Sequence, residues 1–161
     1  MVHFGQMNMN RRRDTDRIDK INYYLDIAQT VMEHSNCLHR SAGAIIVQDD
    51  VIVSTGYSHM ARQDGAPRGE CYEHCRVVHA EATAITGTPR ELMLGATLYL
   101  VGREIQTGEL LTDMWPCTKC LRHIIRAGIV RLVSRISPKD YNTVYVGPDC
   151  TKKGDSLIKV E

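Results

Sequence analysis

The sequence predicts an α/β protein in which helices cover a mixed β-sheet. Segments rich in β-branched residues alternate along the chain with segments of helical periodicity, and this alternation is typical of layered α/β folds. Residues 42–48 and 51–57 are two strand candidates separated by Asp49-Asp50, which predicts an antiparallel hairpin. Helical segments separate the later strand candidates. We therefore expect an α/β sandwich with a mixed sheet.

Length and charge favour one domain without a large nucleic-acid surface. A chain of 161 residues can bury a sizeable core, and we expect one domain over residues 1–161. Residues 1–13 are polar and end in Arg11-Arg12-Arg13, so we expect a flexible tail, with a phosphate- or nucleic-acid-binding arm as the alternative. A formal net charge of +1 favours neither a nucleic acid nor an anionic membrane as partner.

The sequence gives no sign of a membrane span or of secretion. No apolar run approaches the ~20 residues that cross a bilayer, and the N-terminus lacks an apolar signal core. Without a secretory signal, the six cysteines suit metal ligation better than disulfides. We therefore expect a soluble cytoplasmic protein.

Two helices are predicted around the hairpin. Apolar residues recur at helical spacing over residues 14–34, and Asp14 or Thr15 can cap that helix. A second helix is expected from about Cys75, and the breakers Gly87-Thr88-Pro89 end it.

The second half of the chain is predicted to continue the alternation. Strands at 97–101 and 129–136 flank a helix that starts at Pro116 and stops at Gly128, and a turn at Thr107-Gly108 precedes this helix.

Three segments lie outside these elements. Residues 58–70 are expected to form a polar loop, residues 137–154 an irregular segment, and residues 156–160 a last edge strand.

The chemistry of the chain is concentrated in two short segments. The first is His79-Ala80-Glu81 and the second is Pro116-Cys117-Thr118-Lys119-Cys120. Zn²⁺ binds imidazole nitrogen and thiolate sulfur, and a catalytic zinc keeps three protein ligands and leaves the fourth position to water. His79, Cys117 and Cys120 supply three such ligands, because cysteines three apart on a first helical turn face the same way. Glu81 is then the candidate general acid and base.

A closed structural zinc site is the alternative interpretation of these residues. A closed site needs a fourth protein ligand. Cys75 could supply it, because it precedes His79 by four residues and would share a helical face with it. We prefer the catalytic interpretation, because Glu81 is placed where a zinc-activated water needs a proton carrier.

The pattern H-x-E followed by P-C-x-x-C is the signature of zinc nucleobase deaminases, and the wider sequence resembles the deoxycytidylate (dCMP) deaminase family. The resemblance implies a cytidine deaminase-like fold, a three-layer α/β/α sandwich around a five-stranded sheet, with one catalytic Zn²⁺. It also implies hydrolysis of dCMP to dUMP and ammonia by a homo-oligomer, often a hexamer. The matching segments are residues 37–47, 54–57, 66–70, 78–82, 95–100, 116–120 and 124–129.

The same resemblance suggests a second, structural zinc. In the family, a cysteine placed like Cys37 can join ligands upstream of the catalytic helix. Cys71, His74 and Cys75 are the candidates here, although this chain lacks the longer cysteine-bearing loop of many relatives. Reduced, partly buried thiols are the alternative.

Substrate contacts are expected from residues near the two motifs. Backbone N–H groups near Ala80 could hold the developing oxyanion, Trp115 could line the pocket, and Arg68 could bind phosphate. Ser58 and Thr83 occupy positions where relatives usually have asparagine, so sugar and phosphate recognition should differ from theirs.

Other functions remain open at the level of sequence. One alternative is a deaminase of another free nucleoside, nucleotide or aminated heterocycle. A tRNA or polynucleotide deaminase should carry a basic face, which the net charge disfavours. A non-catalytic, zinc-stabilised interaction module is the third alternative.

Overall fold

The computed structural model describes residues 17–60, 77–112, 114–147, 150–153 and 156–159, the last two ranges as backbone strands only. No helix in this described part has both the length and the apolar character that crossing a bilayer requires. The elements in chain order are α1 (Lys20–Met32), β1 (Arg40–Gln48), β2 (Val51–Tyr57), β3 (His59–Met60), β4 (Val77–Val78), α2 (Ala80–Thr86), the 3₁₀ turn η2 (Arg90–Leu92), β5 (Thr97–Glu104), α3 (Thr118–Ala127), β6 (Arg131–Arg135), β7 (Tyr141–Tyr145), β8 (Cys150–Lys153) and β9 (Ser156–Lys159).

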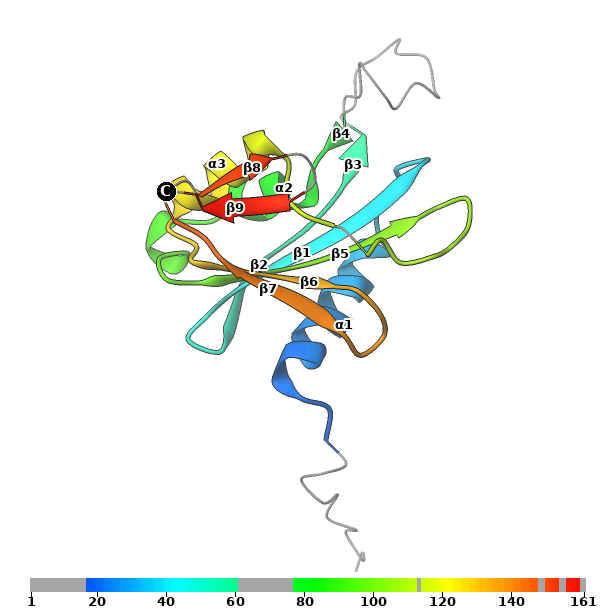
Figure 1. Ribbon diagram of the computed structural model, residues 1–161, viewed down its shortest axis with the longest axis horizontal. Helices are drawn as coiled ribbons and strands as arrows, with labels where there is room; N and C mark the ends of the chain where they lie inside the picture. The colour runs from blue at the N-terminus through cyan, green and yellow to red at the C-terminus, as the bar shows by residue number, and fades with distance from the viewer. Residues whose placement is uncertain (1–16, 61–76, 113, 148–149, 154–155, 160–161) are drawn as a thin grey trace, which may run out of the picture.

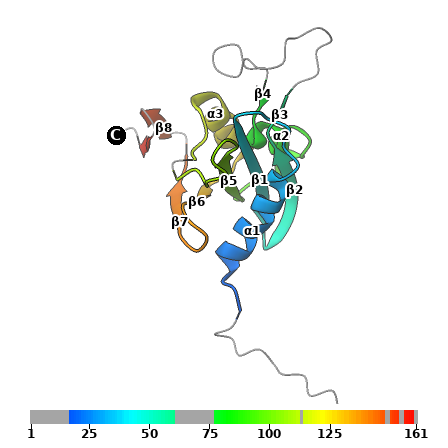
Figure 2. The same ribbon diagram turned by 90° about the vertical axis from the view of Figure 1, so that its right-hand side faces the viewer.

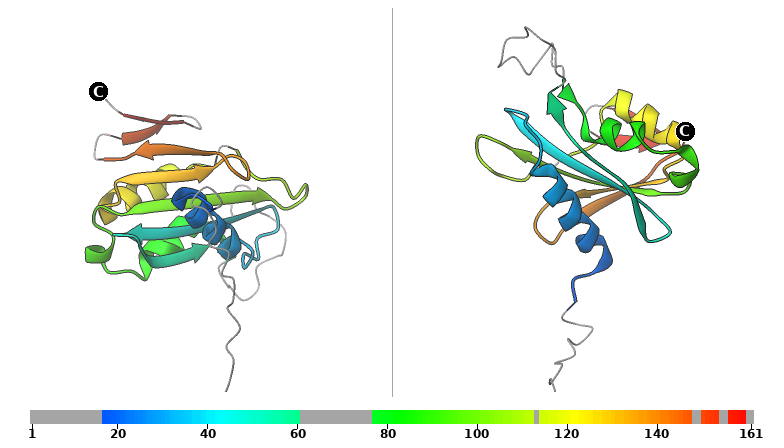
Figure 3. Two further views of the ribbon diagram at one scale, coloured as in Figure 1. Left: turned by 90° about the horizontal axis from the view of Figure 1, so that it is seen from below. Right: turned by 180° about the vertical axis from the view of Figure 1, so that it is seen from behind.

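Five strands form one mixed sheet in the order β2-β1-β5-β6-β7. Neighbouring strands are antiparallel except β5 and β6, which are parallel and are joined by the crossover that contains α3. Helix α1 covers one face of the sheet, and α2 and α3 lie side by side on the other (Figure 1; Figure 3, right). The predicted α/β/α sandwich with a mixed five-stranded sheet is therefore confirmed.

The predicted hairpin is present with the predicted turn. β1 and β2 pair antiparallel, and the two residues between them are Asp49 and Asp50. Their φ angles are 49° and 65°, so both adopt the left-handed conformation that a tight two-residue hairpin turn requires. Aspartate tolerates this conformation better than most residues, which explains why the pair marks the turn.

The predicted start of the first helix is wrong. Helix α1 begins at Lys20, because the Asp19 carboxylate accepts a hydrogen bond from the Asn22 N–H at 3.0 Å and caps it. Asp14 and Thr15, the expected caps, lie outside the described residues. The helix also ends at Met32, two residues earlier than the sequence predicts.

The C-terminal third contains more strand than predicted. Residues 137–154 were expected to be irregular, but they contain β7, which pairs with β6. A tight turn joins the two strands, because the Ile136 N–H donates to the Asp140 carbonyl and the Asp140 N–H donates to Ser137 Oγ. The predicted last strand exists as β9, but it pairs with β8 in a separate two-stranded sheet rather than at the edge of the main sheet. Figure 2 shows β8 set apart from the five-stranded sheet.

The central strands differ from prediction only at their ends. β5 continues three residues beyond the predicted Val101, to Glu104, and β6 is shorter than the predicted 129–136. The predicted turn at Thr107-Gly108 is confirmed, because Gly108 has φ 72° and its N–H donates to the Glu104 carbonyl.

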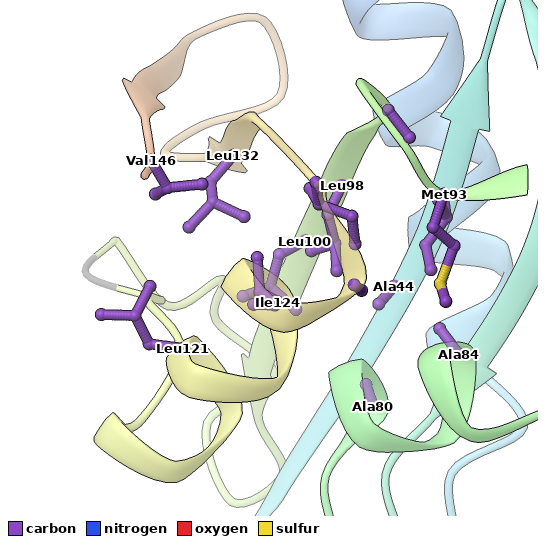
Figure 4. Packing of buried hydrophobic residues seen from close by; sticks show 14 of the residues in the cluster. Ala44, Ala80, Ala84, Met93, Leu98, Leu100, Leu121, Ile124, Leu132 and Val146 are labelled. Carbon is purple, nitrogen blue, oxygen red and sulfur yellow. The ribbon is translucent and has the colours of Figure 1, made fainter. Parts of the chain in front are cut away.

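The sheet separates two hydrophobic cores. Alternate residues of β1 point to opposite faces: Ala44 and Ile46 belong to the core under α2 and α3, whereas Ile45 and Val47 belong to the core under α1. Figure 4 shows the first core, in which residues of α2, α3, β5 and β6 converge. This core holds the two helices whose N-termini carry the motif residues.

Two glycines let the helices touch the sheet backbone directly. A Cβ built at Gly43 would lie 2.2 Å from the Ala28 carbonyl oxygen of α1. A Cβ built at Gly56 would lie 2.4 Å from the Ala80 carbonyl oxygen of α2. No side chain fits at either position, so the two glycines set the distance of α1 and α2 from opposite faces of the sheet.

Candidate metal centre

The two motifs cap neighbouring helices. His79 is the N-cap of α2 and Cys117 is the N-cap of α3, both with extended backbone, and Cys120 lies in the first turn of α3. Pro116 therefore precedes the cap rather than opening the helix. The two helices pack against each other on one face of the sheet (Figure 1).

The predicted helix from about Cys75 is wrong in its first turn. Val77 and Val78 form β4, which pairs antiparallel with β3, and the helix starts only at Ala80. The helical face that was expected to join Cys75 to His79 therefore does not exist. Cys75 itself lies outside the described residues.

The three predicted ligands come together. His79 Nδ1 lies 3.5 Å from Cys117 Sγ and 3.4 Å from Cys120 Sγ, and the three candidate ligand atoms all lie within 4.8 Å of one another. Tetrahedral zinc with Zn–N near 2.1 Å and Zn–S near 2.3 Å would place nitrogen and sulfur about 3.6 Å apart. The donor set and its spacing therefore fit Zn²⁺.

The number of ligands also fits a catalytic site. Among the described residues, the group of metal-binding side chains has three members, His79, Cys117 and Cys120. Three protein ligands leave one position of a tetrahedral zinc for water.

The surroundings of the Cys120 thiol disfavour its ionised form unless a cation is bound beside it. Burial raises the pKa of the Cys120 thiol above its ordinary value, and the nearby Glu81 and Cys117 raise it further. A divalent cation among the ligands reverses this preference by stabilising the thiolates. The Cys120 N–H at the N-terminus of α3 also donates to Cys117 Sγ at 3.4 Å.

Glu81 lies beside the ligands in the first turn of α2. Its side chain is only 2% exposed, and its charge acts on the Cys120 thiol. His79 precedes the helix with extended backbone, whereas Glu81 lies within the first turn, so the two residues do not share a helical face. A buried carboxylate next to a metal centre suits proton transfer.

Two of the predicted substrate residues have their polar atoms engaged within the protein. Ser58 is 4% exposed, and its Oγ accepts from the Ala42 N–H and lies 2.9 Å from Ser35 Oγ. Thr83 Oγ1 lies 3.1 Å from the His79 carbonyl and 3.3 Å from the Tyr57 carbonyl, to which it can donate. The Thr83 hydroxyl thus supports the backbone at His79, whereas the Ser58 hydroxyl links β1 to the segment that follows α1.

The other predicted substrate residues are placed differently. Ala80 is fully buried in the core, so only its backbone can face the site. Trp115 is partly buried and packs on the same core just before Cys117. Arg68 lies outside the described residues.

The second zinc site remains a prediction. Cys37 is 7% exposed and carries a free thiol, and its N–H donates to Ser35 Oγ at 3.3 Å. The other predicted ligands, Cys71, His74 and Cys75, lie outside the described residues.

A pocket of about 400 Å³ lies on the opposite side of the sheet, against α1. Its two carboxylates are already paired, Asp26 with Arg135 at 2.7 Å and Glu33 with Arg103 at 2.7 Å. Because α1 supplies Asp26, Gln29 and Thr30 to its lining, the pocket lies on the α1 face and is separate from the metal centre. Asp26, Gln29, Thr30, Glu33, Leu110, Arg135 and Pro138 line it.

Sequence reasoning missed the residues that hold α2 in place. Ser54 Oγ donates to the Ala84 carbonyl, and Gly56 lets the first turn of α2 rest on β2. The signal was present, since a serine and a glycine interrupt the otherwise β-branched strand Val51–Tyr57.

The fold and the metal centre together define the class. The chain has a mixed five-stranded sheet, a His-Cys-Cys group at the N-termini of two helices, and a buried glutamate in the first turn of one of them. These features define a zinc-dependent deaminase-type enzyme. More particularly, the chain belongs to the family described as the cytidine and deoxycytidylate deaminase zinc-binding region, whose model matches residues 18–136.

Two relatives are deoxycytidylate deaminases. The chain is 32% identical over 139 residues to the deoxycytidylate deaminase of Mycobacterium phage D29, a match that covers 73% of this chain and 94% of the relative. It is 27% identical over 128 residues to the deoxycytidylate deaminase of Schizosaccharomyces pombe. That match covers 71% of this chain but only 36% of the yeast protein, so the two differ in extent.

Solved structures support the fold. The dCMP deaminase of the cyanophage S-TIM5 in its apo form matches with a TM-score of 0.51 at 22% identity, over 71% of this chain and 81% of that one. The cytidine deaminase of Burkholderia pseudomallei matches with a TM-score of 0.54 at 18% identity, over 76% and 90% of the two chains.

Proposed function

We propose that this chain is a zinc-dependent hydrolase that deaminates dCMP to dUMP and ammonia. The observation that carries the proposal is the meeting of His79, Cys117 and Cys120 within 4.8 Å, with the buried Glu81 next to them. The choice of dCMP is supported by the phage relative, which is a deoxycytidylate deaminase and is matched over 94% of its length.

The proposed roles follow from the chemistry of each group. His79, Cys117 and Cys120 would hold Zn²⁺, which when bound supplies Lewis-acid activation of water. Glu81 takes one proton from the attacking water and delivers it to the ring nitrogen of cytosine. It then takes the second proton, from the new hydroxyl on the ring carbon, and passes it to the amine, which leaves as ammonia while the C=O bond forms.

Substrate recognition is proposed to involve groups around the same helix ends. Ala80 and Trp115 are close in sequence to the ligands, and the Thr83 hydroxyl donates to the His79 carbonyl. Arg68 is proposed to contact the phosphate. Because the Ser58 hydroxyl is already engaged with Ala42 and Ser35, we expect it to act by shaping the pocket wall.

The assembly and the cellular setting complete the proposal. We propose a homo-oligomer, a hexamer by resemblance to the family, located in the cytoplasm. Size-exclusion chromatography with light scattering measures the assembly directly, and a monomer at micromolar concentration would contradict this part of the proposal.

Ammonia release from a panel of substrates tests the assigned reaction. The purified zinc-loaded chain is given dCMP, CMP, deoxycytidine, cytosine and guanine at equal concentrations. We expect dCMP to show the highest kcat/KM. A clear preference for an unphosphorylated compound or for guanine would instead establish the alternative, a deaminase of another nucleoside or heterocycle.

A substitution at Glu81 tests whether the chain is an enzyme of this type. We expect Glu81→Ala to lower kcat by about 10³-fold while zinc stays bound, because general acid–base groups contribute roughly 10²–10⁴-fold. Glu91→Ala serves as the matched control, since Glu91 is an exposed glutamate in η2. Activity that survives Glu81→Ala with zinc bound would show that the role of Glu81 is misassigned.

A further inference from the structure

Ser134 is a polar residue at a core position of β6. Along this strand, Leu132 belongs to the core under α2 and α3, and Val133 belongs to the core under α1. Ser134 therefore points to the side of the metal centre, next to Leu100 on β5. It is only 2% exposed. A buried hydroxyl destabilises a core unless it is hydrogen-bonded, so the hydrogen-bond partner of Ser134 shows which segment this residue stabilises.

The partner of Ser134 belongs to the segment that leads to the metal ligands. Ser134 Oγ donates to the Met114 carbonyl at 2.7 Å. Only two residues, Trp115 and Pro116, separate Met114 from the ligand Cys117. The bond thus ties this segment to a central strand of the sheet just before the chain delivers its first thiolate.

Trp115 and Pro116 leave the segment between Met114 and Cys117 little conformational freedom. Pro116 is fully buried, and its ring fixes its own φ. Trp115 packs on the core. On the neighbouring strand, a Cβ at Gly102 would lie 2.8 Å from Met114 Sδ, so the Met114 side chain is pressed onto β5. A shift of the Met114 carbonyl would therefore move Cys117.

We propose that Ser134 is a positioning residue for the metal centre. By holding the Met114 carbonyl, it sets where Cys117 and the first turn of α3 stand relative to His79, and so sets zinc affinity and ligand geometry. The inference rests on the proposed zinc site, but it does not depend on the identity of the substrate. Supporting groups around a metal site typically change its affinity by 10–100-fold when removed.

Metal binding to matched variants tests the proposal. Zinc affinity of wild type, Ser134→Ala and Val133→Ala is measured by competition with a chelating dye, together with the visible absorption of the Co²⁺-loaded chains and thermal unfolding of the metal-free chains. Val133 is the control, because it neighbours Ser134 on β6, is fully buried, and faces α1 instead. Loss of its two methyl groups weakens the same strand without touching the Met114 segment.

We expect Ser134→Ala to lower zinc affinity about tenfold and to change the Co²⁺ ligand-field bands. Val133→Ala should stay within about twofold of wild type in affinity while lowering thermal stability at least as much. Equal zinc affinity in wild type and Ser134→Ala, or equal losses in both variants, would overturn the proposal.

A conservative variant provides a second, independent outcome. Ser134→Thr keeps the hydroxyl, and we expect its zinc affinity to remain within about threefold of wild type. A tenfold loss with the hydroxyl retained would contradict the proposed role, even if Ser134→Ala did not fold. Wild type that binds no zinc would instead refute the proposed function itself, so the two failures are distinguishable.

Discussion

Substitution of Gly56 by alanine should damage the metal centre through the backbone of α2. A Cβ at Gly56 would lie 2.4 Å from the Ala80 carbonyl oxygen and 2.5 Å from the Ala84 N. Both atoms are backbone atoms, so no side chain can swing away. Because ordinary contact begins at 3.4 Å, α2 must move by about 1 Å away from β2.

The displaced turn is the one that carries the site. Ala80 directly follows His79, and Glu81 comes next, so a shift of 1 Å moves a ligand and the proposed proton carrier together. Overpacking of this kind destabilises a fold by about 1–3 kcal/mol. A misplacement of about 1 Å can lower catalysis about 10²-fold. We therefore expect a loss of activity far larger than the lost fraction of folded protein.

Gly43→Ala is the matched control for this experiment. A Cβ at Gly43 would lie 2.2 Å from the Ala28 carbonyl oxygen and 2.6 Å from the Met32 N, so it presses on α1, on the opposite face. Its stability loss should be similar, but the metal centre should stay intact. Urea unfolding, zinc affinity and dCMP turnover per folded molecule are measured for both variants. Equal turnover and zinc affinity in Gly56→Ala and Gly43→Ala would refute this reasoning.

Three further predictions concern stability. Burial and the hydrogen bond to Asp50 raise the pKa of Tyr24 to about 12 from 10.0. The stabilisation linked to this raised pKa is present below pH 10 and is lost as pH rises toward 12. In urea unfolding, the stability advantage of wild type over Tyr24→Phe should therefore fall by up to about 2 kcal/mol between pH 10 and pH 12. Asp26→Asn should destabilise the fold by about 2 kcal/mol, because Arg135 is 3% exposed and loses its ionic partner; Asp26→Leu combined with Arg135→Met should recover most of that loss. Chelation of zinc should lower the thermal midpoint of wild type, by an amount corresponding to about 4 kcal/mol at 1,000 times the Kd, but should leave that of Cys117→Ser nearly unchanged.

Local chemistry was sufficient for the elements that depend on a few adjacent residues. The Asp49-Asp50 turn was predictable because both residues tolerate the left-handed backbone that they adopt. The end of α3 was predictable because Gly128 takes φ 84° and closes the helix. The metal ligands were predictable because few residue types bind Zn²⁺ and their spacing is distinctive.

Elements that depend on a distant partner were predicted poorly. Val77 and Val78 fit a helical pattern by spacing, yet they form β4 because β3 offers hydrogen bonds to an extended chain. Strand β7 has an exposed, polar pattern of its own, and only pairing with β6 makes it a strand. The start of α1 was mispredicted for a local reason, because the Asp19 carboxylate caps the helix at Lys20.

By itself, the sequence determined which side chains are candidates to bind the metal and which carboxylate is the candidate proton carrier. Only the tertiary structure decided that His79 and Cys117, which are 38 residues apart, stand 3.5 Å from each other. The physical reason is that the N-termini of α2 and α3 can converge only because both helices pack on the same face of one sheet. Glycines at the contacts and serines bound to carbonyls then fix the helix positions, and these are long-range contacts that no short segment encodes.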